Sequence, residues 1–345
     1  MVKTEYYKDL TKMNTFGMKV KARCFIEYDS VADLVDIEFE ELARPVLHIG
    51  GGSNLLFTDD FKGTVLHSKV DFIEVLEESS AQVLVSVGAG VVFDDFCAWA
   101  SKEGLWGVEN LSHIPGEVGA SAVQNIGAYG VEVKDVIYKV YCYDTIEEEF
   151  VCFPVEECGY GYRDSIFKNP EIKGRYIVTH VVFALSRIPQ PHLDYGHLKE
   201  AVSAFEDKLT PALIRKVIIK IRKEKLPEPS VIGSAGSFFK NPVITLDHFA
   251  RIEAAAKAEN GPDYKVPHYA LPDGCVKVPA AWLIEQCGWK GRRSGGAAVW
   301  EKQPLVIVNY TGEAYPEEIL GLENKIVTSV KTKYNIALQP EVDHI

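Results

Sequence analysis

Glycine is concentrated in short clusters between residues 50 and 130 of this 345-residue chain. Two of them, Gly50–Gly52 and the Gly88–Gly90 turn, directly follow apolar runs that predict β-strands at 46–49 and 83–87. A glycine turn leaves several backbone N–H groups uncovered, which suits the binding of a diphosphate. The same clusters suit ordinary tight turns, but their closeness in the sequence favours a nucleotide-type cofactor.

A third cluster lies in a stretch of small and amide residues that begins at Ile114 and ends at Gly130. Glu117 is the only charged residue in this stretch. Because small residues let a ligand approach the backbone closely, the stretch could lie against a large planar cofactor. No cluster completes G-x-G-x-x-G, and the chain has no G-x-x-x-x-G-K-[ST]. A Rossmann dinucleotide unit and a P-loop are therefore poorly supported.

The acidic balance of the chain limits its partners. The formal net charge is −12 and hydrophobic residues make up 47%, which fits a globular protein without a basic surface for nucleic acid or anionic membranes. No apolar run approaches the ~18 residues of a membrane span, and the polar first residues predict no signal peptide. Seven cysteines without a C-x-x-C pair, and histidines without H-x-x-x-H spacing, predict no metal site. We expect a cytoplasmic protein with neither nucleic-acid nor membrane partners.

Short strands dominate the first half of the sequence, and longer helices the second half. Further strands are predicted at 136–143, 150–153, 176–185, 305–309 and 336–342, and helices from residue 94, at 211–225, at 279–287 and at 316–332. The fold class is α+β, with two or three domains at ~150 residues each.

Basic residues gather at the end of the helix predicted at 211–225. They are Arg215, Lys216, Lys220, Arg222, Lys223 and Lys225, opposed only by Glu224. A solvated helix face is one explanation. The other is attraction of an anionic ligand, because cations near a helix C-terminus are favoured and both side chains suit phosphate.

Three further segments carry side chains that suit catalysis. Ser237 lies in a glycine turn beside an ammonium and an amide group, but not in a G-x-S-x-G elbow. Arg163, which follows a tyrosine, could hold a carboxylate through two hydrogen bonds, although a surface pair with Asp164 explains it equally well. Glu341 lies near the last residue, where a carboxylate is usually solvated. The residues alone indicate a nucleotide- or flavin-binding enzyme with an anionic substrate.

Taken in order, these segments resemble those of the UDP-N-acetylenolpyruvoylglucosamine reductase (MurB) family. The resemblance extends from residue 14 to residue 342, and the segments around Arg163 and Ser237 are its most specific parts. The matching segments are Asn14–Gly17, Gly50–Phe57, Glu109–Gly116, Gln124–Gly130, Gly161–Phe167, Lys225–Pro227, Ala235–Pro242, Gly295–Val299 and Pro340–Val342.

The resemblance implies a two-subdomain FAD-binding fold of the vanillyl-alcohol-oxidase/p-cresol-methylhydroxylase type, with a separate α+β substrate-binding domain. The first FAD subdomain would cover 1–70, with a C-terminal strand at 335–345 packing nearby. The second would cover 71–225 and include a tyrosine loop near 195. The substrate-binding domain would cover 226–334.

The resemblance also implies an activity, that of a UDP-N-acetylmuramate dehydrogenase in peptidoglycan precursor synthesis. NADPH would reduce noncovalently bound FAD, which would pass the hydride to the enolpyruvyl group of UDP-N-acetylglucosamine enolpyruvate. The product would be the lactyl ether, UDP-N-acetylmuramate. Ser237 would donate the proton, and Arg163 and Glu341 would stabilise the enolate-like intermediate. A monomer is expected.

The binding residues follow from the same resemblance. Those expected to contact FAD are Gly50, Gly51, Gly52, Ser53, Asn54, Ile114, Pro115, Gly116, Ser121, Gln124, Asn125, Gly127, Tyr129 and Arg222. Those expected to bind the substrate are Tyr162, Tyr195, Lys225 and Asn241. Tyr195 resembles the tyrosine that closes over the substrate in the longer subtype of the family.

Two other functions stay open at this point. One is a flavin-dependent oxidase that acts on a carbohydrate and uses oxygen as acceptor. The other is a flavin- or UDP-sugar-binding protein without catalytic activity, against which the presence of Arg163, Ser237 and Glu341 argues.

Overall fold

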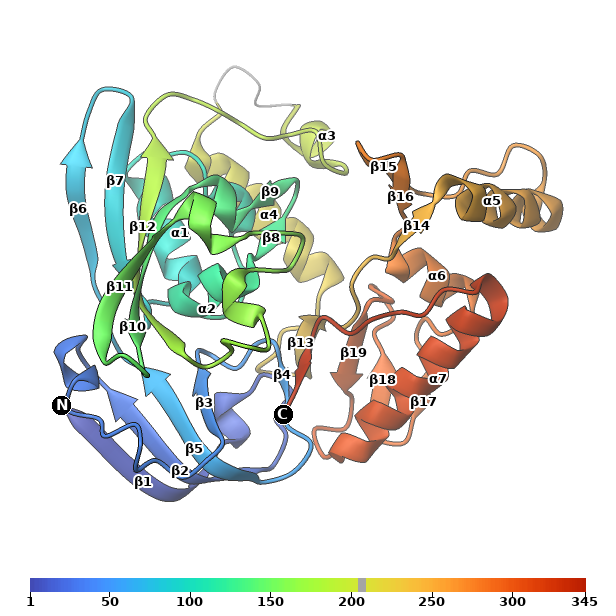
Figure 1. Cartoon of the computed structure of the whole chain (residues 1–345). Helices are drawn as coiled ribbons and strands as arrows, with labels where there is room; N and C mark the ends of the chain where they lie inside the picture. The colour runs from blue at the N-terminus through green and yellow to red at the C-terminus, as the bar shows by residue number, and fades with distance from the viewer. Residues whose placement is uncertain (204–208) are drawn as a thin grey trace. The chain divides into compact units, whose positions relative to one another are not determined.

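The computed structural model describes residues 1–203 and 209–345. The chain divides into two compact units (Figure 1). Unit 1 comprises Met1–Met13, Lys19–Ser53 and Asp60–Glu224, and unit 2 comprises Asn14–Met18, Asn54–Asp59 and Lys225–Ile345. Among the described residues, no helix combines the length and the apolar character needed to cross a membrane.

Unit 1 begins with a four-stranded sheet in the order β1-β2-β5-β3. Its strands are β1 (Val2–Asp9), β2 (Lys21–Tyr28), β3 (Val46–Ile49) and β5 (Phe61–Ser68). β1 and β2 are antiparallel, whereas β5 runs parallel to both β2 and β3. A strand with parallel neighbours is typically covered on both faces, and β5 is buried from Gly63 to Ser68. β3 leads directly into the Gly50–Gly52 loop.

The second sheet of unit 1 is antiparallel, in the order β11-β10-β12-β7-β6. Its strands are β6 (Ile73–Glu78), β7 (Gln82–Gly88), β10 (Ile137–Asp144), β11 (Glu149–Pro154) and β12 (Tyr176–Ser186). Helices α1 (Phe93–Lys102) and α2 (Val118–Gln124) cover one face of this sheet (Figure 1). Phe96 of α1 and Phe183 of β12 lie in that core with ring centroids 4.6 Å apart.

The remaining elements of unit 1 are short, except for α4. Ile214 and Ile218 of α4 pack with Trp106, Leu198 and Val202. These elements are helices α3 (Leu198–Val202) and α4 (Pro211–Lys225, whose last residue belongs to unit 2), the hairpin β8 (Gly127–Ala128) and β9 (Val131–Glu132), and 3-10 helices at Thr11–Met13, Ala32–Leu34, Glu109–Leu111, Val133–Asp135, Val155–Cys158 and Ile166–Lys168.

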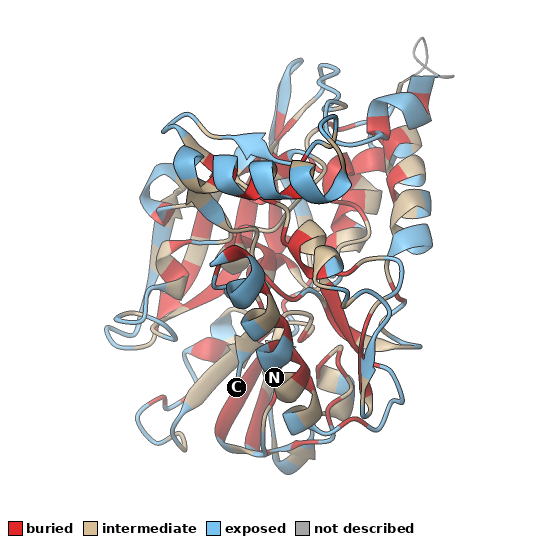
Figure 2. Ribbon diagram, turned by 90° about the vertical axis from the view of Figure 1, so that its right-hand side faces the viewer, coloured by how far each residue is buried: buried red, intermediate tan, exposed pale blue. Residues whose placement is uncertain are grey.

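Unit 2 contains two small sheets, a strand pair and three helices. The strand orders are β13-β19-β18-β17, β14-β16-β15 and β20-β4. Buried residues alternate with exposed ones along its helices and concentrate in its central strands (Figure 2). The elements are β4 (Leu55–Leu56), β13 (Gly233–Ser237), β14 (Val243–Thr245), α5 (Leu246–Asn260), β15 (Tyr269–Ala270), β16 (Cys275–Lys277), α6 (Ala280–Gln286), β17 (Arg293–Ser294), β18 (Ala297–Val299), β19 (Val306–Asn309), α7 (Pro316–Tyr334) and β20 (Asp343–His344).

Most elements predicted from the sequence lie within two residues of the observed ones. The predicted last strand at 336–342 is wrong. Pro340 has no N–H to donate to a ladder, so this segment makes only an isolated bridge to Phe239, and regular pairing begins at Asp343. Helix α5 was not predicted, although Thr245 caps it through the His248 N–H. The three predicted domain boundaries stay a prediction.

Candidate active site

The first and third glycine clusters touch each other in unit 1. The Ser53 hydroxyl donates to the Pro115 carbonyl oxygen at 3.0 Å. A Cβ on Gly116 would lie 2.8 Å from Ser53 Oγ, and one on Gly50 would lie 3.2 Å from the Ala120 Cβ. Gly116 has φ +118°, a conformation that side chains disfavour. The two clusters form one glycine-lined cradle, and the lack of side chains there fits the diphosphate-bearing cofactor expected from the sequence.

The far end of the third cluster is bonded to the Arg163 segment. The Arg163 guanidinium donates to the carbonyl oxygens of Gly127 at 2.6 Å and Asn125 at 3.3 Å. The Asn125 side-chain amide donates to the Gly161 carbonyl at 2.7 Å. Lys168 donates to Gln124 Oε1 at 2.7 Å. Predicted cofactor residues and predicted catalytic Arg163 are therefore parts of one bonded network.

Arg163 itself is held in an unusual backbone conformation. Its φ is +55°, in the left-handed region that few non-glycine residues adopt. The guanidinium lies 5.5 Å from the centre of the Tyr162 ring. Strain of this kind persists where the surroundings over-determine it, which is frequent at functional sites. The two bonds to backbone carbonyls fix the direction in which this side chain points.

Arg222, in the basic end of α4, lies beside Tyr129, and both are predicted to contact the cofactor. Arg222 Nε donates to the His113 carbonyl at 3.1 Å. Burial lowers the pKa of Arg222 and raises that of Tyr129, while attraction between the two groups opposes both shifts. Tyr195 packs edge-on against Tyr129, with ring centroids 6.3 Å apart. Tyr195 is 42% exposed.

In unit 2, backbone pairing brings Ser237 and Glu341 close together. Ser237 ends β13 and is exposed. Phe239 and Pro340 form an antiparallel bridge, and the Glu341 N–H donates to the Phe238 carbonyl at 2.8 Å. The two predicted catalytic residues thus flank a bridge between segments that are far apart in the sequence.

Three further predicted residues also belong to unit 2. The Asn54 amide donates to the Glu341 carbonyl at 3.1 Å, which links Asn54 to the segment of the predicted catalytic residue Glu341. Asn241 Oδ1 accepts the Ala280 N–H at 2.9 Å. The Lys225 carbonyl accepts the Trp300 indole N–H at 3.0 Å.

The predicted site residues are therefore divided between the units. Unit 2 holds Asn54, Lys225, Ser237, Asn241 and Glu341. Unit 1 holds Gly50, Gly51, Gly52, Ser53, Ile114, Pro115, Gly116, Ser121, Gln124, Asn125, Gly127, Tyr129, Tyr162, Arg163, Tyr195 and Arg222. Of these, the Ser121 hydroxyl donates to the Val118 carbonyl of its own helix at 2.7 Å.

Sequence reasoning missed a buried charged group at the glycine cradle. His67 lies between Glu27 and Glu117, at 3.0 and 3.1 Å. The only signal in the sequence was Glu117, the single charge in the stretch 114–130. Nothing in the sequence pattern links it to His67.

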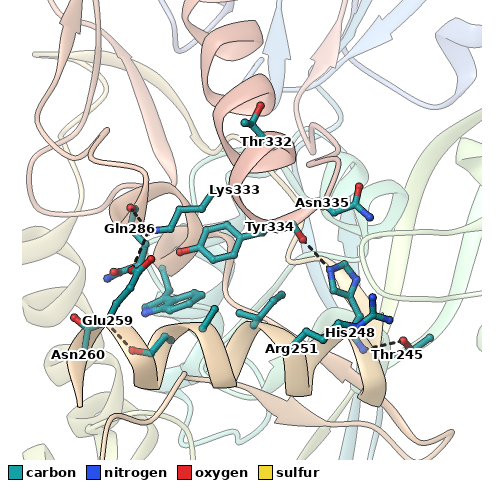
Figure 3. Close-up of a pocket in the computed structure, with 14 residues that line it drawn as sticks. Thr245, His248, Arg251, Glu259, Asn260, Gln286, Thr332, Lys333, Tyr334 and Asn335 are labelled. Atoms are coloured by element: carbon teal, nitrogen blue, oxygen red, sulfur yellow. Dashed lines mark hydrogen bonds and ion pairs between the residues drawn. The ribbon is translucent and has the colours of Figure 1, made fainter. Parts of the chain in front are cut away.

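A pocket of about 450 Å³ lies in unit 2 between α5, α6 and the end of α7 (Figure 3). It is lined by none of the predicted site residues. Its polar groups are bonded to one another: His248 Nε2 to the Tyr334 carbonyl at 2.8 Å, and Lys333 to Glu259 at 3.3 Å. Trp282 donates to the Tyr264 hydroxyl at 3.0 Å. The hydrogen bonds of His248, Lys333 and Trp282 thus tie α5 to the end of α7, and α6 to the Tyr264 segment.

Comparison with known proteins identifies both halves of the chain. Residues 22–145 match the model of an FAD binding domain. Residues 228–345 match the C-terminal domain of UDP-N-acetylenolpyruvoylglucosamine reductase. These matches confirm the predicted α+β fold with an FAD-binding domain of the vanillyl-alcohol-oxidase type, and FAD as the cofactor.

Relatives cover nearly the whole chain. A UDP-N-acetylenolpyruvoylglucosamine reductase of Bacteroides fragilis is 48% identical over 337 residues, which are 97% of this chain and 98% of that protein. One of Porphyromonas gingivalis is 45% identical over 341 residues, 97% of each chain. The solved structure of the enzyme from Thermus caldophilus has a TM-score of 0.68 at 22% identity, covering 100% of this chain and 98% of that one. This chain belongs to the UDP-N-acetylenolpyruvoylglucosamine reductase family.

Proposed function

We propose that the protein reduces UDP-N-acetylglucosamine enolpyruvate to UDP-N-acetylmuramate, with NADPH as the hydride donor. The observation that carries this proposal is the pairing of the Phe238–Phe239 and Pro340–Glu341 segments, which brings the main chains of Ser237 and Glu341 close together. A proton donor and a carboxyl group on paired segments suit an acceptor that gains a hydride at one carbon and a proton at the other. When bound, FAD supplies the hydride chemistry that no amino-acid side chain can provide.

Arg163 stabilises the negative charge that develops on the substrate. Hydride addition to one carbon of the enolpyruvyl double bond leaves charge on the other, delocalised into the carboxylate. A guanidinium already fixed by the Gly127 and Asn125 carbonyls needs no rearrangement as that charge forms. Preorganised positive charge therefore stabilises the transition state more than the ground state.

Ser237 donates the proton. A neutral hydroxyl is a weak acid, but the carbon that it protonates is strongly basic, so the transfer is feasible once the two are aligned. Ser237 suits this role because its main chain is fixed in β13 while its side chain is exposed.

Glu341 acts next to the enolate-like charge, where an ionised carboxylate would be repelled. We propose that it works in its protonated form, as a hydrogen-bond donor to the substrate. The Glu341 main chain is held by two hydrogen bonds, its N–H to the Phe238 carbonyl and its carbonyl to the Asn54 amide, which fix the point from which the side chain extends.

Tyr162, Tyr195, Lys225 and Asn241 bind the substrate. Lys225 ends the basic segment of α4, which suits the diphosphate of a UDP-sugar or of NADPH. Tyr195 closes over the substrate, as in the longer subtype of the family. We also propose that the protein is a cytoplasmic monomer, which light scattering and cell fractionation test.

Anaerobic spectroscopy of the flavin separates the two half-reactions. NADPH should bleach the ~450 nm band, and only the enolpyruvyl substrate should restore it. Bleaching by a sugar without NADPH, followed by recovery and oxygen consumption when oxygen is admitted, would instead support a carbohydrate oxidase. Ser237→Ala should slow recovery by the substrate at least ~10²-fold while reduction by NADPH is unchanged. An unchanged recovery rate would remove Ser237 from the mechanism.

A further inference from the structure

A buried histidine and two partly buried carboxylates lie beside the glycine cradle. They are Glu27 on β2, His67 on β5 and Glu117 just before α2. His67 Nδ1 is 3.0 Å from Glu27 Oε2, and His67 Nε2 is 3.1 Å from Glu117 Oε1. The imidazole side chain is 6% exposed. This geometry uses both nitrogens of the ring.

Two carboxylate partners require a doubly protonated imidazole. An ionised carboxylate can only accept hydrogen bonds, so each ring nitrogen must carry a proton to bond to its partner. Burial alone lowers the pKa of His67, but hydrogen bonds and attraction, first from Glu117 and then from Glu27, outweigh it and raise the pKa above 6.5. The two carboxylate partners and the raised pKa both favour the protonated imidazole.

The other groups around the trio do not replace this charge. Burial, reinforced by the charge on His67, lowers the pKa of His48 to about 3. The neutral His48 lies 2.8 Å from the Tyr28 hydroxyl. Lys3 is the cross-strand neighbour of Glu27, and its ammonium group pairs with Glu5 at 3.1 Å. His67 is thus the cation that faces Glu117.

The trio is joined to the cradle by backbone and by contact. His67 pairs in register with Ile49, the residue before Gly50. Glu117 Oε2 lies 3.2 Å from the position of a Cβ on Gly50, so the carboxylate fills the space beneath the loop. Glu117 also follows Gly116, whose Cα lies 3.5 Å from the position of a Cβ on Gly51. Any change in the charge of the trio therefore changes the electrostatic potential at the cradle.

The charge of the trio depends on one proton. With the imidazolium it carries a net charge of −1, and with a neutral imidazole −2. A diphosphate on the Gly50–Gly52 loop is repelled by negative charge beneath it, and burial strengthens that repulsion. We propose that protonated His67 is a positioning residue for FAD, which neutralises Glu117 beneath the diphosphate loop so that FAD affinity falls when His67 loses its proton. This inference rests on the proposed function.

Titration of the apoprotein with FAD, followed by quenching of flavin fluorescence, tests the proposal. Between about pH 6 and 9, the Kd of the wild type should rise about tenfold with a one-proton inflection above pH 6.5. His67→Gln should bind FAD weakly at every pH, without an inflection. His197→Gln removes an exposed histidine paired with Glu200, and this matched control should titrate as the wild type does.

Glu117→Gln is the second variant, and it tests the same proton without removing the histidine. Loss of the stronger partner should move the inflection to lower pH, and the affinity at pH 9 should exceed that of the wild type. A Kd that is constant from pH 6 to 9, or an inflection that survives in His67→Gln or stays in place in Glu117→Gln, would overturn the proposal. Absence of FAD binding at every pH would instead overturn the proposed function on which it rests.

Discussion

The glycine cradle of unit 1 and the Ser237–Glu341 pair of unit 2 are built in opposite ways. The two segments of the cradle can lie close together because their glycines have no side chains. A Cβ on Gly116 would meet Ser53, and a Cβ on Gly50 would meet Ala120. In the pair, position is set by the backbone, through the bridge from Phe239 to Pro340. Substitution in the cradle therefore disturbs the structure, whereas substitution in the pair removes a chemical group from an intact frame.

This difference predicts which property each mutation affects. Variants of the cradle should lose FAD and stability together. Variants of the pair should retain FAD and their melting temperature, and lose turnover. Measurement of all three quantities on the same variants tests whether the two regions are separable.

Glu341→Ala should give the largest effect on the pair side. Substrate reduction should slow about 10²-fold, because a group that acts by hydrogen bonding in the transition state is lost. The melting temperature and the Kd for FAD should stay the same, since the Glu341 N–H and carbonyl keep their bonds to Phe238 and Asn54. Stopped-flow reoxidation of the flavin measures the rate of substrate reduction, and thermal unfolding measures the melting temperature.

Glu301→Ala is the control for Glu341→Ala, because it removes an exposed carboxylate from the same unit. It should leave all three quantities unchanged. A marked drop in the melting temperature of Glu341→Ala would show that the side chain, and not only the backbone, holds the segment.

Gly116→Ala should give the largest effect on the cradle side. The new Cβ would lie 2.8 Å from Ser53 Oγ at a φ of +118°, and such strain costs about 1–3 kcal/mol. We expect an FAD affinity about tenfold lower, which corresponds to about 1.4 kcal/mol, and a lower melting temperature. Fluorescence titration and thermal unfolding provide both values.

Gly104→Ala separates the effect of backbone strain from the effect of a steric contact. Gly104 also has a positive φ, +72°, but a Cβ there would meet nothing within 4 Å. It should cost some stability and leave FAD affinity as in the wild type. Equal affinities for Gly116→Ala and wild type would mean that the cradle does not hold the cofactor.

The sequence predicted this contrast only in part. Periodicity located α4 and α7, because their apolar residues recur on one face, and glycine clusters located the cradle. The bonds that link Arg163 to Gly127, or Asn54 to Glu341, join residues that are distant in the chain. No local pattern encodes such pairs. The resemblance to the family supplied the residues but not the bonds between them.

Two failures have a clear physical origin. The last strand was predicted from apolar residues at 336–342, but Pro340 interrupts its hydrogen bonding. The His67 trio was missed because its members come from two strands and a loop whose register is set by the parallel pairing of β5. A single histidine in an apolar strand carries no sign of its partners.

Substitution of Glu323 is the most specific test. Glu323 contacts His344, which lies in the same C-terminal segment as Glu341. It is a buried residue of α7, 3.3 Å from His344, and burial raises its pKa to about 7. Burial likewise lowers the pKa of His344, so above pH 7 an ionised carboxylate faces a neutral imidazole. Because the folded pKa lies above the unfolded one, the cost of ionisation is absent below about pH 4.5 and complete above about pH 7.

Glu323→Gln should therefore raise the free energy of unfolding at pH 8 by about 1–2 kcal/mol and leave it unchanged near pH 4.5. Denaturant unfolding at the two pH values measures the difference. Turnover should change little, because the backbone bridge and not this side chain positions Glu341. A variant less stable than the wild type at pH 8 would mean that Glu323 and His344 form an ion pair. In that case side chains as well as backbone bonds would hold the C-terminal segment of unit 2. The difference between the Ser237–Glu341 pair and the glycine cradle would then be smaller than the backbone pairing alone implies.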